Sequence, residues 1–365
     1  MRLAFLLLLL YCPPAGAFVA SSDPVPDWTA DQSAHFADQG DGWQRVVDLR
    51  GTWQFRLGDN LAWSQGEDDG NWETAFVPAT WEDEGFWGYD GFAWYRTTFR
   101  VSPGDAARPL YLHLGRVDDA DEVWLNGRFL GSTGRIGLDY ETGYHSVRIY
   151  RIPQEYLRTR GDNVIAVRVY DDELGGGIVE GQQGIYTTRD APAFESDLVG
   201  GWRFQPGDDL RWAEPGFDDR GWAMITVPAR WEPQGYPGLD GYAWYRRDFT
   251  LKDFDGERRV LLLGQVDDLD EVYVNGRRIG GTGRIDEGNV RGNEWDDARV
   301  YTMPGEVLQE GRNVVAVRVF DSYFDGGIYA GPVGVMRPEA YERWRGREGG
   351  GFVNWFRALL KGGWE

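Results

Sequence analysis

Two segments of the chain combine large aromatic side chains with carboxylates at short spacing. The first segment contributes Trp81, Trp87, Asp90 and Trp94, and the second contributes Trp231, Asp240 and Trp244. An aromatic face can stack on the apolar side of a sugar ring, and a carboxylate can accept hydrogen bonds from the sugar hydroxyl groups. These residue types therefore predict two sites that could bind a carbohydrate. The alternative for the tryptophans is that they anchor strands in a hydrophobic core.

A dense acidic cluster, Asp118–Glu122, and its later counterpart, Asp267–Glu271, could bind calcium, because this hard cation prefers oxygen ligands. Their spacing does not match that of an EF-hand loop. We favour a turn network in which the aspartates bond to nearby amides, so no cofactor is expected and a structural calcium ion is the alternative. A pair of carboxylates could also hydrolyse a glycosidic bond, but the sequence fixes no separation between them.

The elements that must position these residues occur twice. The segment Asp90–Arg96 returns 150 residues later as Asp240–Arg246, which is a whole-domain period and not that of a solenoid unit. We therefore predict a first module over residues 43–190 and a second module over residues 191–338. Further matching pairs are Val117–Gly127 with Val266–Gly276 and Asn163–Asp171 with Asn313–Asp321.

The local pattern in each module is that of short β-strands. Residues 314–320 alternate between two faces with period two, and residues 164–170 repeat this pattern. Asn126-Gly127 and Asn275-Gly276 each stand between apolar runs, which is the strongest short signal of a two-residue hairpin. The predicted fold class is all-β, with two tandem jelly-roll β-sandwich domains and a short C-terminal helix.

Several motifs mark both modules. The first module contains Gly51–Phe55, Trp94–Phe99, Glu122–Gly131 and Gly161–Val167, and the second contains Trp202, Trp244–Phe249, Glu271–Gly280 and Gly311–Val317. With these motifs, each module resembles the galactose-binding-like jelly-roll domain, the sugar-binding domain of glycoside hydrolase family 2 enzymes such as β-galactosidases and β-glucuronidases. The likeness extends over both modules and is more specific for the fold than for a ligand.

The resemblance implies that the aromatic segment and a late acidic loop lie at one end of each sandwich and shape a sugar site. The late loops contain Asp171 in the first module and Asp321 in the second, and Arg135 and Arg284 are expected at the two rims. The candidate sugar-binding residues are thus Trp81, Trp87, Asp90, Trp94, Arg135 and Asp171, together with Trp231, Asp240, Trp244, Arg284 and Asp321.

The hydrolases of this family follow the domain with an immunoglobulin-like domain and a barrel that carries two catalytic glutamates. Only 27 residues follow Pro338 in this sequence. The resemblance therefore implies a non-catalytic protein that binds an oligosaccharide or polysaccharide. The alternatives are a protein–protein scaffold at the cell envelope and an accessory subunit of a glycoside hydrolase whose barrel lies on another chain.

The N-terminal segment has the pattern of a cleaved signal peptide over residues 1–17. It begins with Arg2, continues with the apolar run Leu3–Leu10 and ends with Ala15-Gly16-Ala17, so a secreted or periplasmic location is expected. Lipidation at Cys12 is the alternative. Residues 18–42 are a polar leader.

The C-terminal tail, residues 339–365, differs from both modules. Apolar side chains recur at helical spacing within residues 351–361, and basic residues accompany them, so this stretch could contact a membrane surface or a protein partner. The alternative is that it folds back on the second module. The chain as a whole has a net charge of −21, which repels phosphate backbones and excludes nucleic acid as an expected partner.

Overall fold

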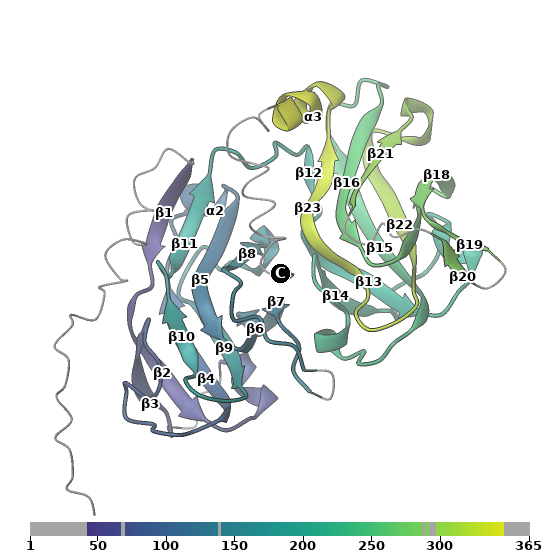
Figure 1. The fold of residues 1–365 in the computed structure, drawn as a ribbon. Helices are drawn as coiled ribbons and strands as arrows, with labels where there is room; N and C mark the ends of the chain where they lie inside the picture. The colour runs from purple at the N-terminus through teal and green to yellow at the C-terminus, as the bar shows by residue number, and fades with distance from the viewer. Residues whose placement is uncertain (1–41, 67–69, 138–139, 287–288, 292–296, 347–365) are drawn as a thin grey trace, which may run out of the picture.

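The computed structural model describes residues 42–66, 70–137, 140–286, 289–291 and 297–346, which form two β-sandwiches side by side (Figure 1). Each sandwich pairs a six-stranded sheet with a smaller sheet. The strand pairs in these sheets are antiparallel, as in β4 with β9 and in β15 with β22. The prediction of an all-β fold with two tandem sandwiches is confirmed.

The first module is built from two sheets. The six-stranded sheet has the order β3 (Glu73–Val77), β2 (Gly51–Leu57), β4 (Gly91–Phe99), β9 (Asn163–Asp171), β6 (Ala120–Leu125) and β7 (Arg128–Thr133). The five-stranded sheet has the order β1 (Trp43–Asp48), β11 (Gly184–Thr188), β5 (Leu110–Asp118) and β10 (Gly177–Glu180), with β8 (Arg148–Ile152) also paired to β5.

The second module repeats this plan. Its six-stranded sheet has the order β14 (Ala223–Val227), β13 (Gly200–Pro206), β15 (Gly241–Leu251), β22 (Gly311–Asp321), β17 (Leu269–Val274) and β18 (Arg277–Thr282). The four-stranded sheet has the order β12 (Ser196–Asp197), β23 (Ile328–Met336), β16 (Arg259–Val266) and β21 (Ala298–Met303). A separate hairpin pairs β19 (Arg284–Asp286) with β20 (Asn289–Arg291).

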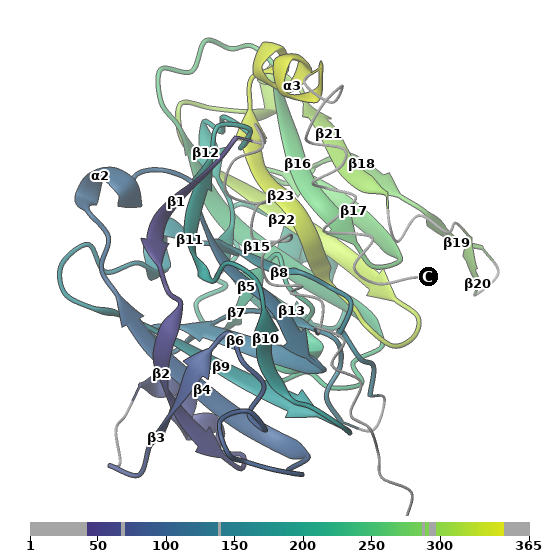
Figure 2. The ribbon, with the colours of Figure 1, turned by 60° about the vertical axis from the view of Figure 1, so that its left-hand side comes forward.

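Helical segments are short. They are the 3-10 turns η1 (Leu61–Gln65), η2 (Gln154–Tyr156), η3 (Leu210–Ala213), η4 (Glu232–Gln234) and η5 (Gly305–Val307), and the α-helices α2 (Pro103–Ala106) and α3 (Pro338–Arg345). Helix α3 lies at one end of the second module (Figure 2). Its Tyr341 and Trp344 pack against the buried cluster of Val260, Leu262 and Met336. The indole of Trp344 donates to the carbonyl of Asp190 at 3.0 Å. A short helix near the C-terminus is therefore present at Pro338–Arg345, whereas the stretch 351–361, in which the sequence predicts helical spacing, lies outside the described residues.

The predicted hairpins have the expected backbone. Asn126 and Gly127 join β6 to β7 with φ angles of 53° and 79°, and Asn275 and Gly276 join β17 to β18 with 49° and 84°. Asparagine and glycine tolerate positive φ better than other residues, which is why this dipeptide specifies the turn.

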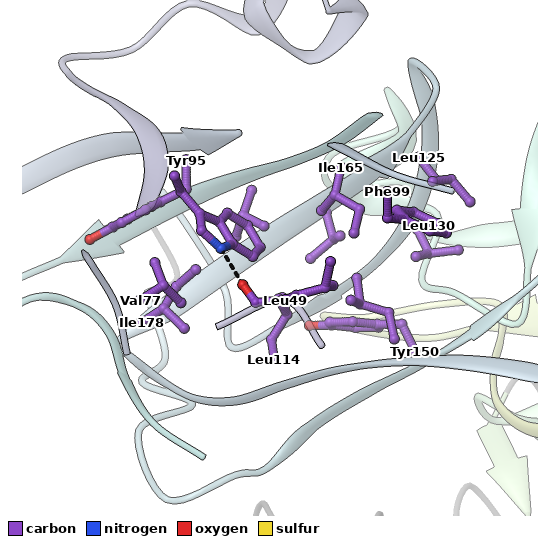
Figure 3. Close-up of a cluster of buried hydrophobic side chains, with 14 of the residues drawn as sticks. Leu49, Val77, Tyr95, Phe99, Leu114, Leu125, Leu130, Tyr150, Ile165 and Ile178 are labelled. Carbon is purple, nitrogen blue, oxygen red and sulfur yellow. Dashed lines mark hydrogen bonds between the residues drawn. The ribbon is translucent and has the colours of Figure 1, made fainter. Parts of the chain in front are cut away.

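Each module has its own apolar core between its sheets, and Figure 3 shows part of the first one around Val77, Leu114 and Ile178. A tryptophan on the second strand of each module fixes the chain that precedes it. The indole of Trp53 donates to the carbonyl of Leu49 at 2.7 Å, and that of Trp202 donates to Leu198 at 2.8 Å. The two modules thus share core contacts as well as sequence motifs.

Direct contacts join the modules. The buried hydroxyl of Tyr156 bonds to that of Thr226 at 2.7 Å, and Thr226 in turn donates to the carbonyl of Phe129 at 2.7 Å. Glu155 accepts from the backbone amide of Gly201 at 2.7 Å. A cleft of about 580 Å³ lies between the modules, with Leu130 on one side and residues of the second module on the other.

Residues 1–41 and 347–365 lie outside the described part of the chain, and so do the predicted signal peptide and almost all of the leader. Within the described residues, the longest helix is α3, and none of the helices has the length and apolar character needed to cross a membrane.

Candidate functional site

The aromatic segment and the late acidic loop meet at one end of the first module. The backbone amide of Trp81 donates to Gly176 at 2.9 Å, and Asp171 lies opposite Gly91 where β9 pairs with β4. In the second module Trp231 likewise donates to Gly326 at 3.2 Å, and Asp321 lies opposite Gly241. These segments are far apart in sequence, and the fold brings them together as the motif resemblance implies.

Four of the predicted sugar-binding tryptophans are core residues. Trp81, Trp94, Trp231 and Trp244 each have a relative exposure of 0%. Trp81 fits so closely against the late loop that a Cβ atom on Gly176 would lie 2.0 Å from its ring. A ring without an exposed face cannot stack on a sugar, so the prediction that these four contact a ligand does not fit their burial, and the core alternative does.

Trp87 and Asp90 are different, because both are exposed at this end of the first module. Trp87 has a relative exposure of 79%, the largest among the described tryptophans. Gly85, Gly88 and Gly91 punctuate the turn that carries Trp87. An exposed indole next to carboxylates is the arrangement that binding to a sugar ring requires.

At the same end of the module, a group of three carboxylates comes from two separate sequence segments. Carboxylate oxygens of Asp118, Asp119 and Asp171 all lie within 4.8 Å of one another. Burial, with the nearby charges of Asp118 and Asp119, raises the pKa of Asp171 to about 8. Burial and the charge of Asp119 raise the pKa of Asp118 to about 7.

Glu82 completes this acidic end. It contributes to the raised pKa values of Asp118 and Asp171, and both of its carboxylate oxygens are buried with no hydrogen-bond partner among the described residues. From the sequence, Glu82 belongs to the aromatic segment, and Asp118 and Asp119 belong to a separate acidic cluster, so their proximity to Asp171 was not predicted. The available signal was the repeat itself, since each of these acids has an acidic counterpart in the second module.

The second module has a similar but modified end. Burial raises the pKa of Glu232 and of Asp321 to about 8 and that of Asp267 to about 7. Asp240 and Arg284 are exposed, and Pro237 stands where the first module has Trp87. This end therefore keeps the acids and lacks the exposed indole.

Arg135 does not lie at the rim of the first site. Its guanidinium reaches across to the second module and pairs with Asp325 at 3.2 Å, while also pairing with Glu141 at 3.0 Å. Arg230 pairs with the same Asp325 at 3.2 Å. The predicted rim residue is therefore an inter-module contact, because the docking of the two modules places it beside the acidic end of the second.

The raised pKa values predict a pH-dependent stability of the second module. Asp321, which faces Glu232, Asp267 and Asp268, stays protonated in the folded state up to a pKa of about 8, whereas it ionises near 4 when unfolded. Its stabilising contribution is complete below pH 4 and is lost as the pH rises to 8. We expect Asp321→Asn to raise the free energy of unfolding at pH 8.5 by on the order of 2 kcal/mol and to change it little at pH 4, as measured by urea unfolding. An equal effect at both pH values would contradict this account.

Comparison with known proteins places residues 59–174 in a family model described as the β-galactosidase second all-β domain. A β-galactosidase of Bacteroides ovatus, BoGH2A, is 29% identical over 170 residues, which are 42% of this chain and 19% of that protein. A putative β-glucuronidase of Formosa agariphila is 35% identical over 140 residues, or 34% of this chain and 13% of that protein. The chain thus spans less than a fifth of the length of either relative.

Solved structures that partly match this chain include a β-glucuronidase of Bacteroides uniformis and one of Bifidobacterium dentium. Each is 15% identical to this chain, with a TM-score of 0.33. The match to the Bacteroides uniformis enzyme covers 80% of this chain and 28% of the enzyme, and the match to the Bifidobacterium dentium enzyme covers 78% of this chain and 43% of the enzyme. The family match and the curated relatives confirm the resemblance seen in the motifs: over part of its length, this chain is related to the β-sandwich domains of glycoside hydrolase family 2 proteins.

Proposed function

We propose that this chain is a non-catalytic carbohydrate-binding protein that recognises a glycan at the acidic end of its first module. The observation that carries the proposal is the exposed indole of Trp87, three residues before exposed Asp90. Asp90 and Glu82 both interact electrostatically with Asp171, so this turn lies at the acidic end of the module. The indole supplies a face for a sugar ring, and exposed Asp90 supplies acceptors for its hydroxyl groups. The relatives named as β-galactosidase and β-glucuronidase support a carbohydrate as the class of ligand.

The two modules are not equivalent in this proposal. In the second module, Pro237 replaces the indole, and Arg135 and Arg230 both pair with Asp325 at the corresponding end. A proline ring offers less stacking surface than an indole, and the arginines already occupy a carboxylate. The first module is therefore the expected binding module, with one glycan per chain.

Truncation of Trp87 tests this proposal. A glycan array with residues 18–365 identifies a ligand, and calorimetry then measures its affinity. We expect Trp87→Ala to weaken binding by roughly 5- to 150-fold, which corresponds to the loss of about 1–3 kcal/mol for an aromatic contact. Because the indole is exposed, the variant should keep the thermal stability of the parent.

The matched control is Tyr323→Ala, since Tyr323 is an aromatic residue of 75% exposure at the end of the second module. Its affinity should equal that of the parent. A glycan that binds equally well to the Trp87→Ala variant would place the site elsewhere, with the cleft between the modules as the next location to test. No binding to any neutral or acidic glycan would favour the scaffold at the cell envelope over the carbohydrate-binding protein.

The proposed location is secreted or periplasmic, on the basis of the signal-peptide pattern in residues 1–17. Expression of the full sequence with N-terminal sequencing of the exported product is the test. A mature chain that begins at Phe18 supports it, and an uncleaved chain retained in the cytoplasm opposes it.

A further inference from the structure

The acidic group of the first module has a feature that a turn network does not explain. Asp171 is fully buried, and among the described residues no donor lies within hydrogen-bonding distance of either of its carboxylate oxygens. These oxygens belong to the same group as those of Asp118 and Asp119. Asp119 accepts hydrogen bonds from the Thr142 hydroxyl at 2.5 Å and from the backbone amide of Asp172 at 3.1 Å, whereas Asp171 is a buried carboxylate without a partner, which is costly.

We propose that Asp118, Asp119 and Asp171 bind a divalent cation, and that this cation is calcium. Asp118 ends β5, Asp119 follows it directly, and Asp171 ends β9, so two neighbouring strand ends and a turn supply the ligands. The proposal rests on this geometry and does not depend on whether the chain binds a glycan.

The chemistry of the group favours calcium among the divalent cations. The group consists of carboxylate oxygens alone, which suits a hard cation and not a transition metal that prefers imidazole or thiolate. Calcium binds oxygen at about 2.4 Å, so two oxygens on one ion can be up to about 4.8 Å apart. The carboxylate oxygens here lie within 4.8 Å of one another and could therefore share one calcium ion.

The equivalent acids of the second module lie in a different arrangement, although Asp321 is also buried and, among the described residues, its carboxylate oxygens have no hydrogen-bond partner. Arg230 stands directly before Trp231, where the first module has Thr80 before Trp81. Arg230 pairs with Asp325 and interacts electrostatically with Asp267 and Glu232, so a cationic side chain is part of that acidic end. In the described part of the chain, Asp267, Asp268 and Asp321 do not form a group with metal-ligand spacing.

One further arginine near the acidic end of each module is already paired with an aspartate. Arg148 lies near Asp118, but it is fully buried and pairs with Asp121 at 2.7 Å. Arg299 makes the equivalent pair with Asp270 at 2.8 Å in the second module. The two ends differ at Thr80, which is Arg230 in the second module, and at Gly175, which is Asp325, the acid with which Arg230 pairs.

The test is calorimetric titration of calcium chloride into the full mature chain after treatment with a chelator, together with thermal unfolding with and without calcium. We expect one site and a calcium-dependent rise in the unfolding temperature, because a ligand that binds the folded state stabilises it. Asp171→Asn should abolish both effects. Asp321→Asn, the matched change in the second module, should leave both unchanged.

Thr80→Arg gives an independent variant. It places in the first module the cation that the second module already has, so it should remove calcium binding without loss of folding. The absence of calcium binding and of a thermal shift in the parent chain would overturn the proposal, and so would calcium binding that persists in Asp171→Asn or in Thr80→Arg. Because Trp87→Ala is expected to bind calcium normally, failure of the glycan proposal and failure of the metal proposal are distinguishable.

Discussion

Replacement of Asp121 by alanine is expected to lower the free energy of unfolding by about 3–5 kcal/mol. The Asp121 carboxylate pairs with Arg148 at 2.7 Å and accepts a hydrogen bond from the hydroxyl of Tyr150, and both side chains of the ion pair have no exposed area. Without the carboxylate, a guanidinium remains buried with its charge unpaired. That cost, more than the loss of the bond itself, gives the large effect.

The Asp121→Ala substitution should also perturb the acidic end of the first module. Arg148 also donates to the carbonyl of Asp119 at 2.7 Å and to that of Ser146 at 2.6 Å, so it holds the turn in which Asp119 lies. A guanidinium without Asp121 is free to leave these positions. Calcium binding should therefore be weakened in any folded fraction of the variant.

Two further variants serve as comparisons for Asp121→Ala in urea unfolding. Asp270→Ala removes the equivalent carboxylate of the second module, which pairs with Arg299 at 2.8 Å, and should cost a similar amount. Asp218→Ala removes an exposed partner of Arg220 and should leave the free energy of unfolding almost unchanged. Equal and small effects at all three positions would show that the buried pairs do not contribute as described.

Replacement of Gly115 by alanine is expected to destabilise the first module by about 3 kcal/mol or more. A Cβ atom at this position would lie 1.9 Å from the carbonyl oxygen of Glu180, and the φ angle of 72° adds strain for any residue with a side chain. The obstacle is backbone, so it cannot rotate away. Either β5 or β10 must shift, and β5 ends at Asp118.

The Gly88→Ala variant separates the cost of the positive φ angle from the cost of the steric clash. Gly88 has a similar φ angle of 65°, but a Cβ atom there would meet nothing within 4 Å. It should cost only the backbone strain, about 1 kcal/mol. Urea unfolding of both variants measures the two losses in the free energy of unfolding. Equal losses would mean that the structure relaxes around a Cβ atom at Gly115, close to Glu180, without cost.

Local sequence patterns were sufficient to predict the fold. Asn126-Gly127 and Asn275-Gly276 specify hairpins because positive φ is a property of the residues themselves. Period-two alternation predicts strands because side chains leave a strand on alternate faces, and the repeat shows that one such domain occurs twice. These signals need no knowledge of distant contacts.

The site depended on contacts that no local pattern contains. Trp81 and Trp87 are six residues apart in one segment, yet one is buried and the other is 79% exposed, because only Trp81 meets the loop around Gly176. Asp119 joins Asp171 only because β5 and β9 end at the same edge of the module. Arg135 faces the second module because the two sandwiches dock.

The sequence alone therefore determined the elements, their duplication and the residue types available for binding. Tertiary structure decided which of those side chains are exposed, which carboxylates share one small volume, and which charges are already paired. Burial and proximity between distant segments arise from the packing of whole sheets and modules, and this is why they could not be predicted from spacing along the chain.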